Sequence, residues 1–290
     1  MNIIRAQHMG MCFGVRDAIK LAQQEAERGP LTILGDLVHN ETVLADLRER
    51  GIQIEQNAGA ISSRQVMITA HGASERAIQA VRARGHVVTE ATCPLVHHAH
   101  QAARKLAGEG YHLVVIGKRD HVEVRGLTGD LDAFDVVLSE AEIDALPERA
   151  RFGVIAQTTQ PIGRVRQLVA HLRARFPRSE TRFTDTVCQP TKQRQNAAIE
   201  LARQCDVVVV IGGAHSNNTR ELVGTCARFC PRVHHVRTAD DLRPEWFQDN
   251  DTIGLTAGTS TPDSTIDSVE QWLRDLSPSL HSEVPVHAAI

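Results

Sequence analysis

Three cysteines at matching positions of an internal repeat are the residues of this sequence best suited to metal chemistry. Cys12, Cys93 and Cys188 each precede a helix-like stretch, which leads to an apolar strand ending in glycine. The strand-ending glycines follow these cysteines by 23, 24 and 24 residues. Such regular spacing indicates three copies of one unit. If the three copies pack around a common centre, their three thiolates could bind a single metal ion or metal cluster.

Soft thiolate ligands select zinc or iron-sulfur clusters. Structural zinc usually takes local pairs such as C-x2-C, whereas these ligands lie 81 and 95 residues apart. Single ligands from separate domains favour a larger cofactor, such as a 4Fe-4S cluster whose fourth iron lacks a cysteine and stays open. The alternative is three buried thiols, because free cysteine is often buried. We expect packing roles for the other three cysteines, Cys205, Cys226 and Cys230.

Neutral polar side chains follow the ends of the predicted strands. They are candidate substrate-binding residues: His39, Asn40, His71, His121, Thr158, Thr159, Ser216, Asn217, Asn218 and Ser260. A ring of imidazoles, hydroxyls and amides near helix N-termini suits a phosphate or diphosphate. Neither a Walker A motif nor G-x-G-x-x-G follows a strand, which disfavours a nucleotide.

Glu123 is the one acid among these strand-end residues, two positions after His121. A carboxyl group beside an anion site is unfavourable unless it is protonated or serves as a proton relay. We therefore expect Glu123 to be protonated or to act as a proton relay; the alternative is a solvated glutamate in a loop. The nearby His97, His98 and His100 fall at spacings that suit a shared metal site poorly, so we expect them on a helix surface.

Strands alternating with amphipathic helices must position these residues. This alternation predicts right-handed βαβ crossovers and parallel sheets, in which ligands bind beyond the carboxyl ends of strands. The predicted fold class is α/β, with three small pseudo-threefold-related α/β domains around a central iron-sulfur cluster. The predicted boundaries are 1–92, 93–187 and 188–276 for the three repeats and 277–290 for a C-terminal tail.

Composition excludes several classes of protein. The 290 residues are 42% hydrophobic and 23% charged with a net charge of -3, which is typical of a globular protein and not of a disordered or coiled-coil chain. This charge and ten aromatic residues argue against a nucleic-acid partner. No apolar run approaches the roughly 18 residues of a membrane span, and no signal peptide is visible. We expect a cytoplasmic monomer or weak homodimer without membrane contact.

The motifs together resemble the 4-hydroxy-3-methylbut-2-enyl diphosphate reductase family (LytB/IspH). The resemblance covers nearly the whole chain, in the order that the family has. It rests on the segments 11–15 (MCFGV), 38–40 (VHN), 70–72 (AHG), 91–96 (ATCPLV), 121–124 (HVEV), 157–159 (QTT), 188–195 (CQPTKQRQ), 216–219 (SNNT) and 256–263 (TAGTSTPD).

The resemblance implies roles for individual residues. Cys12, Cys93 and Cys188 would bind a 4Fe-4S cluster in which one iron has no cysteine ligand. Glu123 would deliver a proton, with Thr158 orienting the substrate hydroxyl, and His121 completes the catalytic group. The diphosphate would be held by His39, His71, His121, Ser216, Asn218 and Ser260.

The implied reaction is a two-electron reductive dehydroxylation of an allylic diphosphate. It would convert (E)-4-hydroxy-3-methylbut-2-enyl diphosphate to isopentenyl and dimethylallyl diphosphate, the last step of the non-mevalonate isoprenoid pathway. A ferredoxin or flavodoxin would supply the electrons.

Three positions depart from the pattern that the family usually shows. Lys118 stands where a histidine is usual, Val122 replaces a proline, and Asn217 replaces a serine. A paralogue with a different diphosphate substrate therefore stays open. So does a cluster-dependent lyase or condensing enzyme, because quinolinate synthase resembles this plan of three α/β repeats with one cysteine each. A non-catalytic iron-sulfur sensor is the third alternative, against which the many strand-end polar residues argue.

Overall fold

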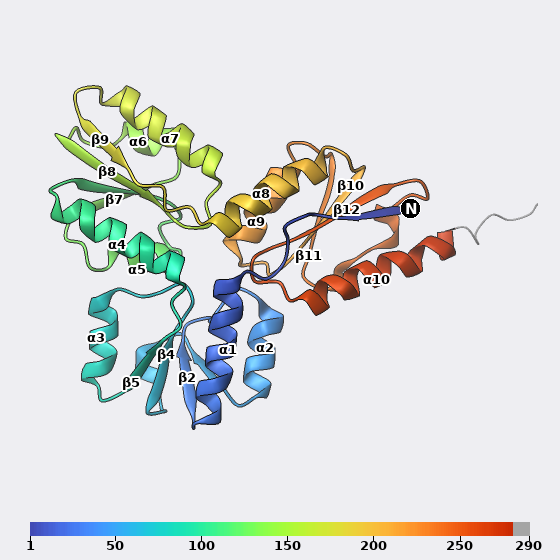
Figure 1. Ribbon diagram of the computed structural model, residues 1–290, viewed down its shortest axis with the longest axis horizontal. Coiled ribbons are helices and arrows are strands. Elements are labelled where there is room, and N and C mark those ends of the chain that lie inside the picture. Colours follow the sequence, from blue (N-terminus) through green and yellow to red (C-terminus); the bar gives the residue numbers. More distant parts are fainter. Residues whose placement is uncertain (281–290) are drawn as a thin grey trace, which may run out of the picture. The chain divides into compact units, whose positions relative to one another are not determined.

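The structure, a computed structural model, describes residues 1–280, and side chains to residue 276. It contains three four-stranded sheets in which every neighbouring pair of strands is parallel, each with its helices (Figure 1). This confirms the predicted α/β class with parallel sheets. Within the described residues, no helix combines the length and the apolar character needed to cross a membrane.

The first sheet has the strand order β3 (Gln53–Glu55), β2 (Leu31–Leu34), β4 (Gln65–Ile68), β5 (Val87–Glu90). Its segment of chain also forms helices α1 (Phe13–Glu27), α2 (Glu41–Glu49), the 3-10 turn η1 (Ala58–Ala60) and α3 (Glu75–Ala83).

The second sheet repeats this order with β7 (Phe134–Val137), β6 (His112–Ile116), β8 (Arg151–Ala156), β9 (Glu180–Phe183). Its helices are α4 (Pro94–Gly108), α5 (Val122–Thr128), α6 (Glu140–Asp144) and α7 (Ile162–Arg175). Val114 and Ile116 of β6 pack in one apolar cluster with α7, whereas Leu113 and Val115 pack in another with α4. Helices α4 and α7 therefore cover opposite faces of this sheet.

The third sheet has the order β11 (Arg232–Val236), β10 (Val207–Ile211), β12 (Thr252–Ala257), β1 (Asn2–Arg5). Its helical elements are α8 (Gln189–Ala202), α9 (Asn217–Cys226), η2 (Ala239–Asp241), η3 (Pro244–Trp246) and α10 (Asp263–Leu280). Every residue of β10 is buried, because apolar clusters cover both faces of this strand.

The fourth strand of the third sheet comes from the opposite end of the chain. In Figure 1 the blue N-terminal strand β1 runs beside the orange strand β12, with Ile3 opposite Ile253 in parallel register. Strands β5 and β9 hold this place in the other two sheets and come from within their own repeats. Strand β1 thus completes the third sheet, although it lies in the range predicted for the first repeat.

Contacts divide the chain into two compact units. The terminal unit consists of Met1–Met11 and the described residues from Gln193 onward, and the central unit of Cys12–Lys192. The central unit holds the first two sheets, so the predicted division at 92 and 187 stays a prediction. Helix α10 continues to Leu280, four residues beyond its predicted end, and the rest of the predicted tail, 281–290, lies outside the described residues.

Two strand glycines let the helices approach their sheets closely. A Cβ on Gly153 of β8 would lie 3.0 Å from the Cβ of Leu106 in α4, and one on Gly254 of β12 would lie 2.8 Å from the Cγ of Leu201 in α8. Both leucines stand 13 residues after the cysteine that precedes their helix. The repeat thus conserves one helix-to-sheet contact in two copies.

We predict that Gly153→Ala and Gly254→Ala each lower the free energy of unfolding by about 1–3 kcal/mol, because the added methyl group overpacks this contact. Urea denaturation measures the effect. Gly163→Ala on α7 is the matched control, because no atom lies within 4 Å of its added Cβ. Unchanged midpoints for the two strand variants would show that the leucine side chains adjust to the added methyl group without a loss of stability.

Candidate active site

Each of the three repeat-matched cysteines belongs to the central unit and stands at the beginning of a helix. Cys12 and Cys93 are the N-caps of α1 and α4, and the carbonyl oxygen of Cys188 accepts the first amide bonds of α8, from Thr191 and Lys192. All three side chains are partly exposed free thiols. A helix N-terminus favours a negative charge, so this position suits thiolates that bind a metal.

The three thiols share one neighbourhood. A Cβ on Gly14 would lie 2.5 Å from the Sγ of Cys93, so the start of α1 packs directly on that sulfur. Burial raises the pKa of Cys188 to about 11 and raises the pKa of Cys93, and the charges of Cys12 and Glu123 add to both shifts. Thiols this reluctant to ionise must release protons when a metal binds them. Their role as ligands stays a prediction.

Backbone hydrogen bonds attach two of the cysteines to strand ends. The amide of Cys93 donates to the carbonyl of Ala70 at 3.1 Å, and the amide of Cys188 donates to the carbonyl of Thr158 at 3.0 Å. Ala70 and Thr158 hold equivalent places, each two residues after the end of β4 or β8. Each thiol is thereby placed beside the polar residues that follow its strand.

Three predicted substrate-binding histidines meet in the central unit. The ring centroids of His39 and His71 are 4.2 Å apart, and His121 lies 5.2 Å from the first and 5.7 Å from the second. Burial lowers the pKa of His71 well below its ordinary value, and the two neighbouring imidazoles lower it further. This ring is therefore neutral, and its Nδ1 is buried without a hydrogen-bond partner among the described residues.

The tautomer of His121 follows from one hydrogen bond. Its Nδ1 accepts from the amide of Glu123 at 3.1 Å and so caps α5. In a neutral imidazole the proton then resides on Nε2, which becomes a donor. Neutral N–H donors of this kind suit an anionic ligand.

Glu123 is almost fully buried, with 1% of its surface exposed. Its carboxylate accepts from the amide of Thr158 at 2.6 Å and from the Thr158 hydroxyl at 3.0 Å. Burial raises the pKa of Glu123 to about 7, although both bonds from Thr158 oppose the shift. Glu123 is therefore poised to give up or hold a proton near neutral pH.

Gln157 organises the strand ends around this acid, although the sequence indicated no separate role for it. Its Oε1 accepts from the amide of Lys118 and from the side chain of Gln160, and its Nε2 donates to the hydroxyl of Thr159. The side chain has no exposed surface. This buried amide links the ends of β6 and β8 and so fixes the two following loops relative to each other. In the sequence, only its position directly after a strand could have indicated this role.

The remaining predicted binding residues belong to the terminal unit. Ser216 caps α9 by accepting from the amide of Thr219, and the Oδ1 of Asn218 accepts from the amide of Thr259 at 3.0 Å. The Nδ2 of Asn218 is buried and has no partner within residues 1–280. Asn217 and Ser260 are buried as well. This polar group is formed within the terminal unit itself.

Several other predicted residues have structural surroundings that the sequence did not indicate. Asn40 caps α2 by accepting from the amide of Val43. The prediction for His100 is wrong: this side chain is buried, with 6% exposed, because it faces the Gly72 turn. His97 and His98 lie on the surface as predicted.

The other cysteines behave as expected. Cys205, Cys226 and Cys230 are buried in one apolar cluster of the terminal unit. The prediction of packing roles is confirmed.

A family model described as LytB protein matches residues 3–274. The chain belongs to the LytB family. A curated relative from Geobacter metallireducens, named 4-hydroxy-3-methylbut-2-enyl diphosphate reductase, is 38% identical over 95% of this chain and 98% of its own length. Another of the same name, from Geobacter sp. strain M21, is 39% identical over 93% of this chain and 95% of its own length.

Two solved structures extend the LytB resemblance to three dimensions. A structure of (E)-4-hydroxy-3-methyl-but-2-enyl diphosphate reductase, described as the terminal enzyme of the non-mevalonate pathway, has a TM-score of 0.68 at 33% identity and covers 94% of this chain and 99% of its own. The Plasmodium falciparum E-1-hydroxy-2-methyl-but-2-enyl-4-diphosphate reductase has a TM-score of 0.88 at 26% identity, covering 94% and 87%. These two reductases therefore resemble this chain in both sequence and fold.

The raised pKa of Glu123 predicts a pH-dependent stability. A carboxyl group whose folded pKa exceeds its unfolded value stabilises the fold at low pH, and this contribution is lost as the pH rises from about 4.5 to about 7. In the unmodified protein this ionisation lowers the free energy of unfolding by about 3 kcal/mol. Glu123→Gln keeps the shape and both contacts with Thr158 but does not ionise, so it avoids this loss. The variant should therefore gain stability over the unmodified protein between pH 5 and pH 8.

Thermal melts of the cofactor-free proteins at pH 5 and at pH 8 measure this gain in stability. Glu148→Gln, at an exposed carboxylate, is the control for the change of charge. A gap that does not grow with pH would refute the assigned pKa.

Proposed function

We propose that this chain is a 4-hydroxy-3-methylbut-2-enyl diphosphate reductase. The reaction takes two electrons and two protons, breaks the allylic C–O bond, releases water and yields isopentenyl and dimethylallyl diphosphate. The names of the LytB relatives support this function. The observation in this chain that carries it is the buried acid Glu123, which is held by Thr158 and whose charge helps to raise the pKa of Cys93 and of Cys188.

The donor set fits an iron-sulfur cofactor. Each of the three thiols lies at the beginning of a helix, and the bare Cα of Gly14 leaves room for the sulfur of Cys93. We propose that Cys12, Cys93 and Cys188 hold a 4Fe-4S cluster in which one iron has no cysteine ligand. When bound, the cluster supplies the two electrons and a Lewis-acid position.

Glu123 is proposed as the proton donor. A pKa near 7 keeps a large fraction of this carboxyl group protonated at neutral pH, whereas an ordinary glutamate would be ionised. The departing hydroxyl needs a proton to leave as water, and the Glu123 carboxyl can provide it. Thr158 holds both carboxyl oxygens, so it fixes the direction of the proton and orients the substrate hydroxyl.

The diphosphate is the proposed ligand of the polar clusters. In the central unit, His39, His71 and His121 offer imidazole donors, and neutral rings bind an anion without the desolvation cost of a buried cation. In the terminal unit, Ser216, Asn217, Asn218 and Ser260 offer hydroxyl and amide groups. Asn40 and Thr159 are proposed to support the first cluster. Substitution of either set should raise KM for the same substrate.

The electron donor is proposed to be a ferredoxin or flavodoxin, because the reaction consumes electrons that the diphosphate substrate does not carry. A lyase or condensing enzyme would turn over without reductant. A sensor would show no change in its cluster spectrum when the diphosphate is added. These two outcomes separate the alternatives from the reductase.

The first test is an anaerobic assay of the reconstituted protein with (E)-4-hydroxy-3-methylbut-2-enyl diphosphate and reduced methyl viologen. We expect viologen oxidation and both isopentenyl and dimethylallyl diphosphate as products. An intact cluster without turnover would contradict the assigned substrate. Lys118, Val122 and Asn217 would then be the first positions to examine for an altered specificity.

A second prediction isolates the acid. Glu123→Gln should retain iron and sulfide but lose at least about a hundredfold in kcat, because the amide cannot donate the required proton. In the unmodified enzyme kcat should fall as the pH rises above about 7, since Glu123 then loses its proton. Normal turnover in the variant, or a rate that rises through pH 8, would exclude Glu123 as the donor.

A further inference from the structure

Helix α4 presents two exposed cations, Arg104 and Lys105. From Pro94 to Gly108 it contains an arginine, a lysine and three histidines but no acidic residue. The side chains of Arg104 and Lys105 are exposed and form no hydrogen bond or ion pair with any described residue. Arg104 lines a cavity that also contains Glu75 and Glu90, so Lys105 is the cation of α4 that is available to a partner.

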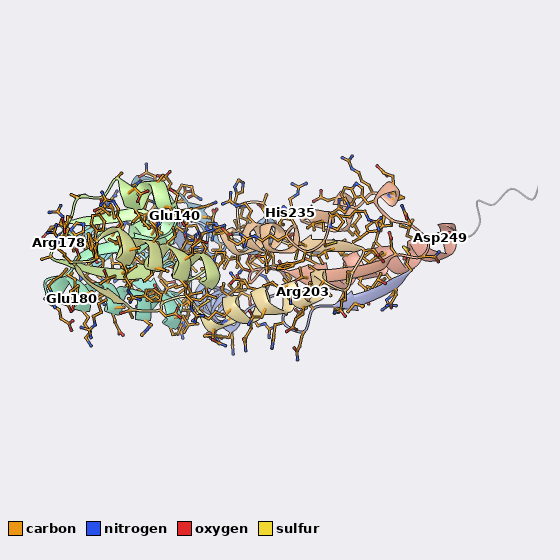
Figure 2. The ribbon with its side chains drawn as sticks, turned by 90° about the horizontal axis from the view of Figure 1, so that it is seen from above. Glu140, Arg178, Glu180, Arg203, His235 and Asp249 are labelled. Atoms are coloured by element: carbon orange, nitrogen blue, oxygen red, sulfur yellow. The ribbon has the colours of Figure 1, made fainter. Side chains whose placement is uncertain are left out.

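The other cation-rich helix of this sheet is different. Helix α7 has four arginines and His171, but acidic residues of α6 lie against it: Asp144 pairs with His171 and lies 3.9 Å from Arg175. Arg178 and Glu180, near the start of β9, are labelled in Figure 2, and Glu180 pairs with Arg151.

A cavity of about 250 Å³ runs along this surface of α4. His98, Gln101 and Lys105 form one side, and Arg182 and Thr184, at the end of β9, form the other. Ala102 and Leu106 make an apolar floor. Arg182 pairs with Glu109, the residue that follows α4, which leaves Lys105 as the lining cation without an ion-pair partner among the described residues. The groove thus offers an apolar base and a cationic wall.

Both walls of this groove lead to proposed cluster ligands. Helix α4 begins directly after Cys93, and His98 lies five residues on, about 7.5 Å along the helix axis. On the other wall, Thr184 precedes Cys188 by four residues. Electron transfer through protein weakens steeply with distance, so a donor must dock near the cluster. This groove lies near two of the three ligands.

We infer that the α4 groove docks the acidic protein that delivers electrons to this enzyme. This inference rests on the proposed function, because a reductase needs two electrons per turnover. A carrier that gives one electron at a time is itself oxidised by one electron and must bind and leave twice. Brief, repeated docking favours charge attraction around a small apolar contact over a large permanent interface. A cationic groove selects a partner with an acidic face.

The test uses the reconstituted holoenzyme and compares two charge reversals. Lys105→Glu changes the groove, and Arg173→Glu makes the same change of charge on α7, on the opposite face of the sheet. Both residues are exposed and stand in the last turn of their helices, so the effects on helix stability match. Photochemically reduced flavodoxin serves as the acidic carrier, and reduced methyl viologen as a small reductant that needs no docking surface.

We expect Lys105→Glu to raise KM for flavodoxin about tenfold at low salt, while the rate with methyl viologen stays unchanged. Arg173→Glu should match the unmodified enzyme with both reductants. The flavodoxin-driven rate should fall with ionic strength in the unmodified enzyme, and less steeply in Lys105→Glu. Binding of oxidised flavodoxin, measured by NMR titration, should weaken in parallel.

Different failures point to different proposals. If Lys105→Glu binds flavodoxin as tightly as Arg173→Glu does, the docking surface is elsewhere and this inference is overturned. If all three proteins fail with methyl viologen, the proposed function fails, and the NMR titration still decides whether the groove binds the acidic carrier.

Discussion

The candidate active site depends on a backbone constraint that no side-chain substitution can remove directly. The amides of Cys93 and Cys188 donate to carbonyls two residues past β4 and β8, so each thiol moves with the end of a buried strand. The same strand ends carry His71 and Thr158. Thr158 therefore joins three functions, since its carbonyl holds a cysteine while its amide and hydroxyl hold Glu123. Thiols, imidazoles and acid keep their relative positions because the parallel sheets fix the strand ends.

This geometry also sets the chemical character of the site. Burial opposes charge on Glu123, on His71 and on the thiols of Cys93 and Cys188, so the protein alone favours the neutral forms of these groups. Two hydrogen bonds from Thr158 offset part of that effect at Glu123 and leave its pKa near 7 instead of far above it. A neutral pocket suits a substrate that carries negative charge, because the site then has no buried charge of its own to desolvate.

Much of this could be predicted from the sequence, because it is written in local patterns. The spacing of Cys12, Cys93 and Cys188 and the polar residues after each strand indicated three parallel α/β sheets and their polar edges. The pairing of β1 with β12 joins the two ends of the chain, and periodicity carries no signal for such a contact. Burial of His100 depends on the Gly72 turn of another repeat, and the bonds of Gln157 depend on how two strand ends meet. These are tertiary facts that short-range propensity does not contain.

The place of β1 bears on how the protein is made. The ribosome delivers this strand first and its partner β12 almost last, so the third sheet cannot close until nearly the whole polypeptide has emerged. The central unit is continuous from Cys12 to Lys192 and needs no later residue for its two sheets. All three repeat-matched cysteines belong to it. During synthesis, the proposed cluster site can thus form while about the last hundred residues are still being translated and the first strand is still unpaired.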